Sequence, residues 1–238
     1  MTISSRSSAR PFFLVLALLP LFAVPQSLYG TLPFADEKIQ GPQTIPGKVW
    51  LAYFDQGGPD VSYHSYDGKN HGSCELNPCT GTNAIYKNVF RKDEGASTSY
   101  TKPPNGGWTG DRFSANNSQV PVDQMYWGWN AIGNWVRLSL LVKKGGNYTL
   151  SLFGSSNSGG ALTLTVDDYL QKGKAVTTTA TIPATDGYHQ WALFPDIAVL
   201  PSLPPGLALL AVNVTGIYAY KEGSQFGNLL WFDFHWKG

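Results

Sequence analysis

The fold class is decided by the stretch Asn134-Trp-Val-Arg-Leu-Ser-Leu-Leu-Val-Lys-Lys-Gly-Gly-Asn-Tyr-Thr-Leu-Ser-Leu-Phe-Gly-Ser-Ser-Asn-Ser-Gly-Gly-Ala-Leu-Thr-Leu-Thr-Val-Asp-Asp168. Three runs in it alternate apolar and polar residues, and glycine-bearing turns at Lys143–Asn147 and Gly154–Gly160 separate them. A strand with a period of two buries one face and exposes the other. Three such strands in a row predict an antiparallel meander within a β-sandwich.

The same kind of pattern continues on both sides of this stretch, and no run with helical periodicity stands out. The predicted strands are Lys48–Phe54, Gly95–Tyr100, Met125–Trp129, Trp135–Val142, Tyr148–Phe153, Ala161–Val166, Thr177–Ile182, Gln190–Ile197, Leu207–Val214 and Leu229–His235. Two segments without a pattern, Gly72–Asn88 and Pro103–Ser118, are predicted to be long loops. Long ordered loops on a β scaffold usually carry function.

The N-terminal residues 1–30 have the features of a secretory signal peptide. Two arginines precede an apolar stretch from Pro11 to Val24, which is shorter than the roughly twenty residues that span a bilayer. Cleavage is expected between Ala23 and Gly30, with a retained signal anchor as the alternative. Residues 31–44 are predicted to be a linker, and residues 45–238 a single all-β domain. We expect a secreted monomer that has no contact with the membrane after cleavage.

Composition excludes one class of partner and favours another. The 238 residues are 42% hydrophobic and 14% charged, with a formal net charge of +1. A nucleic-acid-binding protein needs a clustered basic surface, so no nucleic acid partner is expected. Eight tryptophans and twelve tyrosines exceed the needs of a core of this size. Some of these rings are therefore expected at the surface, where they can stack on a ligand.

Two cysteines are present, Cys74 and Cys79, and after export they are expected to form a disulfide. An unpaired couple of thiols is the alternative. A metal site would need further ligands of a similar kind nearby, and His71 alone does not complete one. No metal and no cofactor are therefore predicted.

Signals for catalysis are weak. Glycoside hydrolysis generally uses two carboxylates that flank the scissile bond. The pairs Asp93-Glu94 and Asp167-Asp168 are chain neighbours, which in a strand places their side chains on opposite faces. The sequence contains no Gly-x-Ser-x-Gly nucleophile motif. We expect no enzymatic activity, and a small glycosidase or lyase with an atypical site is kept as an alternative.

A binding role fits the loop Ala184-Thr-Asp-Gly-Tyr-His-Gln-Trp191 better. Tyr188 follows the turn residue Gly187, so its ring is expected to point away from the core. An exposed ring can stack on the apolar face of a pyranose, and its hydroxyl stays free to form hydrogen bonds. The alternative is a sandwich-corner tyrosine whose hydroxyl is bonded to the backbone.

Several stretches, in order along the chain, resemble carbohydrate-binding module family 6. The opening stretch Ile45-Pro-Gly-Lys-Val-Trp-Leu-Ala-Tyr-Phe-Asp55 looks like the family's first strand. The other similar stretches are Val61–Asn70, Phe90–Gly95, Trp129–Trp135, Gly187–Trp191, Pro205–Leu207 and Asn228–Phe232. The resemblance thus extends over the whole predicted domain. It implies a β-jelly roll without catalytic activity that binds sugar in a cleft between loops.

The resemblance also implies which residues bind the sugar. Phe90 and Tyr188 would clamp the ring, and Asn228 would form hydrogen bonds with it. Beyond the resemblance, nearby polar groups such as Gln190 are expected to help set the orientation of the sugar. Phe90 stands where most members have tyrosine, which removes one hydroxyl. Leu230 stands where the family's closing strand has a second asparagine.

A further departure from the family concerns calcium. Members commonly hold a structural calcium ion with two glutamates of the opening strand, and here Trp50 and Ala52 occupy those positions. Calcium requires oxygen ligands, carboxylates above all, and without the two glutamates only candidates such as Asp233 remain. The sequence therefore predicts no calcium at this site.

The predicted function is non-catalytic binding of a polysaccharide such as a β-linked glucan, a xylan or a related wall polymer. The main rival is an extracellular structural or adhesion sandwich that binds no sugar.

Overall fold

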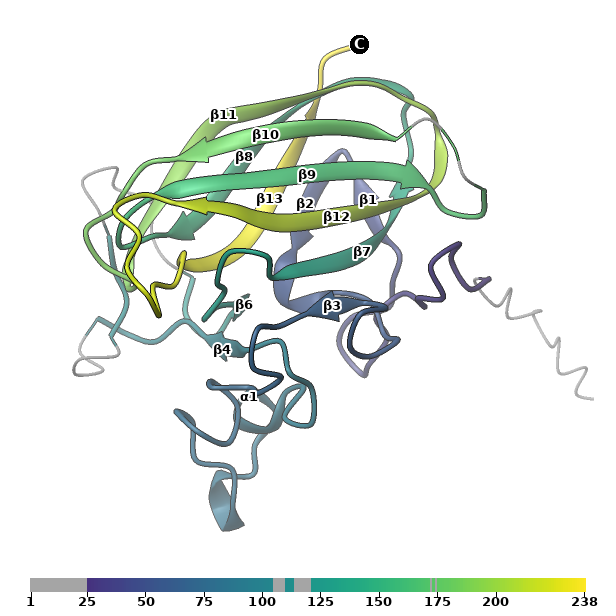
Figure 1. Cartoon of the computed structure of the whole chain (residues 1–238). Helices are drawn as coiled ribbons and strands as arrows, with labels where there is room; N and C mark the ends of the chain where they lie inside the picture. Colours follow the sequence, from purple (N-terminus) through teal and green to yellow (C-terminus); the bar gives the residue numbers. More distant parts are fainter. Residues whose placement is uncertain (1–24, 105–109, 114–120, 172, 174) are drawn as a thin grey trace, which may run out of the picture.

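The computed structural model describes residues 25–104, 110–113, 121–171, 173 and 175–238. They form two facing β-sheets (Figure 1). The six-stranded sheet contains β1 (Gln43–Ile45), β7 (Trp135–Val142), β12 (Gly206–Ile217), β9 (Gly160–Asp168) and β10 (Val176–Ile182) in this order, with β3 (Tyr63–His64) paired to β7. The seven-stranded sheet runs β4 (Thr98–Tyr100), β6 (Met125–Trp127), β13 (Asn228–Trp236), β8 (Gly146–Ser155), β11 (Gln190–Leu203) and β5 (Arg112–Phe113), with β2 (Gly47–Trp50) paired to β13. The all-β jelly-roll sandwich predicted from the sequence is confirmed.

The predicted meander is wrong, although its three strands form. β7 and β9 belong to one sheet, where β12 lies between them, and β8 belongs to the other. The turns after β7 and β8 therefore carry the chain from one sheet to the other. Period-two alternation specifies that a strand has one buried face. It does not specify which strand lies beside it.

The sandwich core is formed by the inward residues of both sheets. Leu150 and Leu152 of β8 and Phe232 and Phe234 of β13 belong to it. The alternate positions of these strands face outward, and two of them, Phe153 and Trp231, are also apolar. They belong to a second, aromatic cluster of Tyr126, Phe153, Trp191, Leu230 and Trp231. This cluster adjoins the end of the sheet where the candidate site lies.

One predicted strand is shorter than expected. Lys48–Phe54 was predicted as a continuous strand, but β2 ends at Trp50 and a 3-10 turn, η1 (Leu51–Tyr53), follows. Leu51 and Ala52 are both buried, so these neighbouring residues face the interior together. Such a pair does not suit a strand, whose successive side chains point to opposite faces.

The predicted linker is part of the folded domain, which corrects the assignment of residues 31–44. The backbone of Leu32 forms hydrogen bonds with that of Gln56 in both directions. β1 pairs with β7, and the ring of Phe34 is buried against other aromatic rings. The polar composition of the segment concealed the contribution of this one ring.

Most of the predicted signal peptide, residues 1–24, lies outside the described residues.

A small lobe projects away from the sandwich below β4 and β6 (Figure 1). It contains the 3-10 turn η2 (Gly81–Asn83) and the single helical turn α1 (Tyr86–Val89), within the segment predicted as a long loop. Much of the other predicted loop, Pro103–Ser118, lies outside the described residues. Within the described part of the chain, no helix has the length and apolar character that crossing a bilayer requires.

Candidate functional site

A pocket of about 530 Å³ opens at one end of the seven-stranded sheet. It lies where β8 ends and β13 and β11 begin. Tyr188 and His189 come from the loop before β11. Asn228 is the first residue of β13, and Gln225 lies in the segment before it. The other lining residues are Tyr126 and Trp129, and His71, Glu75 and Leu76 of the disulfide segment. Most ligand pockets have this volume range and this mixture of rings and polar groups.

Tyr188 is half-buried, and its loop is fastened to the sheet. Its backbone oxygen accepts hydrogen bonds from the Asn228 amide, at 2.6 Å, and from the Ser155 hydroxyl. Its own hydroxyl donates to the backbone oxygen of Gln225 at 3.3 Å. The structure therefore combines the two alternatives drawn from the sequence: the ring lines a pocket, and the hydroxyl contacts the backbone. A bond this long is weak, so a ligand hydroxyl can replace it at little cost.

Asn228 is almost fully buried, and its amide nitrogen is already used in holding the Tyr188 loop. Gly128 lies against the Asn228 side chain: a Cβ atom at Gly128 would approach the Asn228 Oδ1 to 2.5 Å. Glycine at this position is therefore required for the asparagine to lie where it does. Asn228 lines the pocket, and its amide group positions Tyr188.

Trp129 and the buried Tyr126 are aromatic residues of this pocket that were not selected from the sequence. The predicted strand Met125–Trp129 would place Trp127 and Trp129 on the same, buried face. Instead β6 ends at Trp127, which is buried in the core, and Trp129 adopts a left-handed backbone conformation with φ of 50°. Its ring is half-buried and lines the pocket. The preceding glycine, Gly128, was the available sign that the strand ends there.

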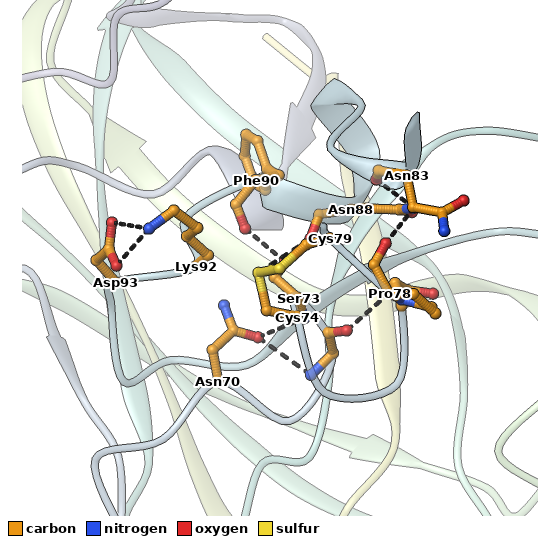
Figure 2. The surroundings of a disulfide bond; sticks show 12 residues. Asn70, Ser73, Cys74, Pro78, Cys79, Asn83, Asn88, Phe90, Lys92 and Asp93 are labelled. Atoms are coloured by element: carbon orange, nitrogen blue, oxygen red, sulfur yellow. Dashed lines mark hydrogen bonds and ion pairs between the residues drawn. A yellow bond between two sulfur atoms is a disulfide. The ribbon is translucent and has the colours of Figure 1, made fainter. Parts of the chain in front are cut away.

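Phe90 is not in the pocket, which corrects its predicted role in stacking. Its ring is only 4% exposed. It packs against Phe34, Tyr53 and Tyr86, with ring centroids 5.3 to 5.8 Å apart. In Figure 2 the Phe90 carbonyl, which accepts a hydrogen bond from the Ser73 hydroxyl, faces the disulfide segment, and the ring points away. A buried ring cannot stack on a sugar, so Phe90 belongs to the structure of the lobe.

Gln190 is the first residue of β11 and is half-buried. Its backbone N–H donates to the Gly187 oxygen at 3.3 Å, which closes the turn that carries Tyr188. It is not among the residues that line the pocket.

One wall of the pocket comes from the disulfide segment. Cys74 and Cys79 are bonded to each other, and Asn70 and Asn88 hold the backbone on either side (Figure 2). The Asn70 oxygen accepts from the backbone N–H groups of Gly72 and Ser73, and the Asn88 amide donates to the oxygens of Pro78 and Asn83. The segment is therefore well fixed, and it presents His71, Glu75 and Leu76 to the pocket.

His71 lies between two carboxylates. Its Nε2 is 2.6 Å from Asp67 Oδ2 and its Nδ1 is 3.0 Å from Glu75. Burial alone would lower the pKa of His71, but the hydrogen bonds with Glu75 and Asp67 outweigh it and raise the pKa above its usual value. The pair also lowers the pKa of Asp67, although burial opposes this change. His71 therefore connects Asp67, which precedes the disulfide, to Glu75, which lies within it.

On the other side of the pocket, His189 Nδ1 is 3.0 Å from the buried carboxylate of Asp111. The Trp191 indole donates to the same carboxylate oxygen. Asp111 thus fixes His189 and the first strand residues after the Tyr188 loop.

The calcium site of the resembled family does not fit this chain. The Trp50 ring packs on Trp231 at 5.0 Å, and Ala52 is buried against the Phe90 cluster. Neither side chain has an oxygen atom to offer a hard cation. Asp233 pairs across the sheet with Lys48. In the described residues, no three histidine, cysteine, aspartate or glutamate side chains are grouped to hold a metal ion.

We accordingly expect that excess chelator leaves the melting temperature unchanged, because no oxygen ligands from these positions bind calcium. Thermal unfolding with chelator and with added calcium measures this directly. A clear loss of stability in chelator would show that calcium is bound elsewhere in the chain.

Comparison with known proteins gives structural likenesses only, since no protein-family profile and no curated protein matches the sequence. The chain is similar to a β-1,3-glucan-binding family 6 module from Bacillus halodurans, with a TM-score of 0.40 and 19% identity over 59% of this chain and 86% of that chain. It is also similar to a family 6 module from Clostridium stercorarium in complex with cellobiose, with a TM-score of 0.43 and 10% identity over 84% of this chain and 100% of that one.

A third similar structure is an arabinoxylan arabinofuranohydrolase from Bacillus subtilis, with a TM-score of 0.41 and 19% identity. The match covers 59% of this chain but only 25% of the hydrolase. Other similar structures are described as family 6 and family 35 carbohydrate-binding modules. At such low identity, family membership stays a resemblance, and the fold assignment rests on the sheets described above.

Proposed function

We propose that this chain is a secreted, non-catalytic and monomeric module that binds polysaccharide in the pocket between Tyr188 and Trp129. The observation that carries the proposal is the presence of two half-buried rings in one pocket, on well-fixed loops. Pyranose rings have apolar C–H faces that stack on such side chains. The candidate polymers are β-linked glucans, xylans and related wall polysaccharides.

The acidic groups of the pocket support binding over hydrolysis. Glu75 is the only carboxylic acid among its described lining residues. Glycosidases that use the common mechanism require two carboxylates on opposite sides of the scissile bond. Two features support secretion: the disulfide Cys74–Cys79, which is typical of oxidising compartments, and the apolar N-terminal stretch.

Affinity electrophoresis of the mature protein through gels that contain glucans, xylans or galactans tests this proposal. We expect retardation by at least one polymer, with micromolar to millimolar affinity, or roughly −4 to −8 kcal/mol. No release of reducing sugar is expected. If no polymer slows the protein, the proposal fails and a structural or adhesion role gains support.

Two substitutions test the site. Trp129→Ala and Tyr188→Ala are each expected to weaken binding by about tenfold or more, because each removes one ring from the ligand contact. Tyr188→Phe keeps the ring and should bind nearly as well as the wild type. Trp236→Ala is the matched control, since this exposed ring lies at the opposite end of β13 from Asn228. Equal losses in Trp236→Ala and Trp129→Ala would contradict the site.

A further inference from the structure

A second hollow, of about 390 Å³, adjoins the pocket described above. Gln225 lines both. The second hollow also contains Tyr66, Ile132 and Tyr220, and the structure leaves these three apolar side chains exposed to solvent. Tyr66 and Tyr220 are each 55% exposed. Two large rings that line one hollow and remain this exposed are typical of a binding surface.

Three chain segments build both hollows. The segment that contributes His71 and Glu75 to the pocket begins with Tyr66 in the second hollow. The turn that starts at Trp129 continues to Ile132. The segment that leads to Asn228 starts with Tyr220. These three walls of the pocket therefore continue along the chain into the second hollow, whereas the Tyr188–His189 loop lines the pocket alone.

Hydrogen bonds fix these segments to one another. The backbone N–H of Tyr66 donates to Asn134 Oδ1 at 3.1 Å. The N–H of Phe226 donates to the Asn130 oxygen at 2.7 Å, and that of Gly227 to Asn130 Oδ1 at 3.2 Å. The walls are thus held in place before any ligand arrives, which lowers the entropy cost of binding a long ligand.

We propose that the two hollows form one continuous groove that binds an internal segment of a polysaccharide chain, with Tyr66 and Tyr220 contacting sugar units beyond those held by Trp129 and Tyr188. This inference rests on the proposed function and adds the length of ligand that the site recognises. A polymer is the expected ligand, because the groove presents rings along its length, in both hollows.

Titration calorimetry with cello-, xylo- and laminari-oligosaccharides, each from the disaccharide to the hexasaccharide, tests the inference. We expect the wild-type affinity to rise about tenfold between the disaccharide and the longer ligands of the series that binds. The double variant Tyr66→Ala/Tyr220→Ala should lose this gain and keep the disaccharide affinity unchanged. Both rings are mainly exposed, so the variant is expected to fold, and its melting temperature checks this.

Other variants separate this inference from the proposed function. Trp129→Ala should weaken binding to ligands of every length, and Trp236→Ala to none. Equal wild-type affinity for the disaccharide and hexasaccharide, or a double variant that keeps the gain with length, would overturn the groove and leave the pocket intact. Absence of binding to all three series and to the polymers would overturn both.

Discussion

Replacement of Phe90 by alanine is expected to lower the free energy of unfolding by about 3–5 kcal/mol, the usual cost of removing a buried phenylalanine ring. The Phe90 ring is the centre of an aromatic cluster in which it contacts Phe34, Tyr53 and Tyr86. Its loss leaves a cavity and removes three ring contacts at once. Urea denaturation measures the change as a shift of the midpoint.

The same variant is expected to keep its sugar affinity as long as it stays folded, because Phe90 does not line the pocket. Binding should therefore be measured well below the unfolding temperature. Phe90→Leu is the milder control, since it keeps most of the apolar volume and should cost less stability. A stable Phe90→Ala variant that has lost its sugar affinity would restore the stacking role that the sequence assigned to Phe90.

The corrected role of Phe90 and the corrected assignment of residues 31–44 have the same origin. The motif around Phe90 gave its position along the chain but not the direction of its ring. The Phe90 ring points toward the ring of Phe34 and packs against it. Phe34 belongs to residues 31–44. These residues were predicted to be a linker because they are polar on average. A contact between segments that are so far apart in sequence is not contained in the local pattern of either.

The location of Tyr188 could be predicted, because a turn glycine beside an aromatic residue is a local signal. Trp129 follows a glycine too, but the strand pattern of Met125–Trp129 kept it from being selected. It stands two residues after Trp127, and period two places both on the same face. Only the left-handed backbone at Trp129 turns it toward the pocket, and this conformation is rare for a residue with a bulky side chain.

The strands themselves were predicted well because each buries one face of a common core. Their partners were not, since the turns after β7 and β8 lead into the opposite sheet. The disulfide segment was predicted as a long loop with a Cys74–Cys79 bond, and in the structure it forms a wall of the pocket. Its detailed chemistry, with His71 between Asp67 and Glu75, depends on the folding of the segment onto itself.

A buried carboxyl group gives the other large expected effect. Asp55 is 1% exposed, and its carboxyl accepts hydrogen bonds from the Ser139 backbone N–H at 2.8 Å and the Ser139 hydroxyl at 2.7 Å. Burial raises the pKa of Asp55 from 3.8 to about 6, although the bonds with Ser139 oppose the shift. The Arg91 guanidinium donates to the Asp55 backbone oxygen and also pairs with Glu94. Its positive charge lowers the pKa of Asp55 and so offsets only part of the effect of burial.

The folded protein therefore holds the proton of Asp55 more tightly than the unfolded chain does. The stabilisation is complete below pH 3.8, the usual pKa of the group, and is lost as the pH rises through about 6. A shift of this size corresponds to about 3 kcal/mol. Other carboxyl groups add their own pH dependence, so the effect is best isolated by comparison with a variant.

Asp55→Asn is that variant, since an amide is neutral at every pH and of nearly the same shape. Its oxygen can accept from the Ser139 N–H, and its nitrogen can donate to the Ser139 hydroxyl, which acts as donor or acceptor. We expect Asp55→Asn to gain about 3 kcal/mol relative to the wild type between pH 4 and pH 7. Urea denaturation at each pH measures the difference, and Asp93→Asn, at an exposed position, is the matched control. Parallel stability curves for wild type and Asp55→Asn would show that Asp55 is ionised in the folded protein throughout this range, with Ser139 and Arg91 compensating fully for its burial.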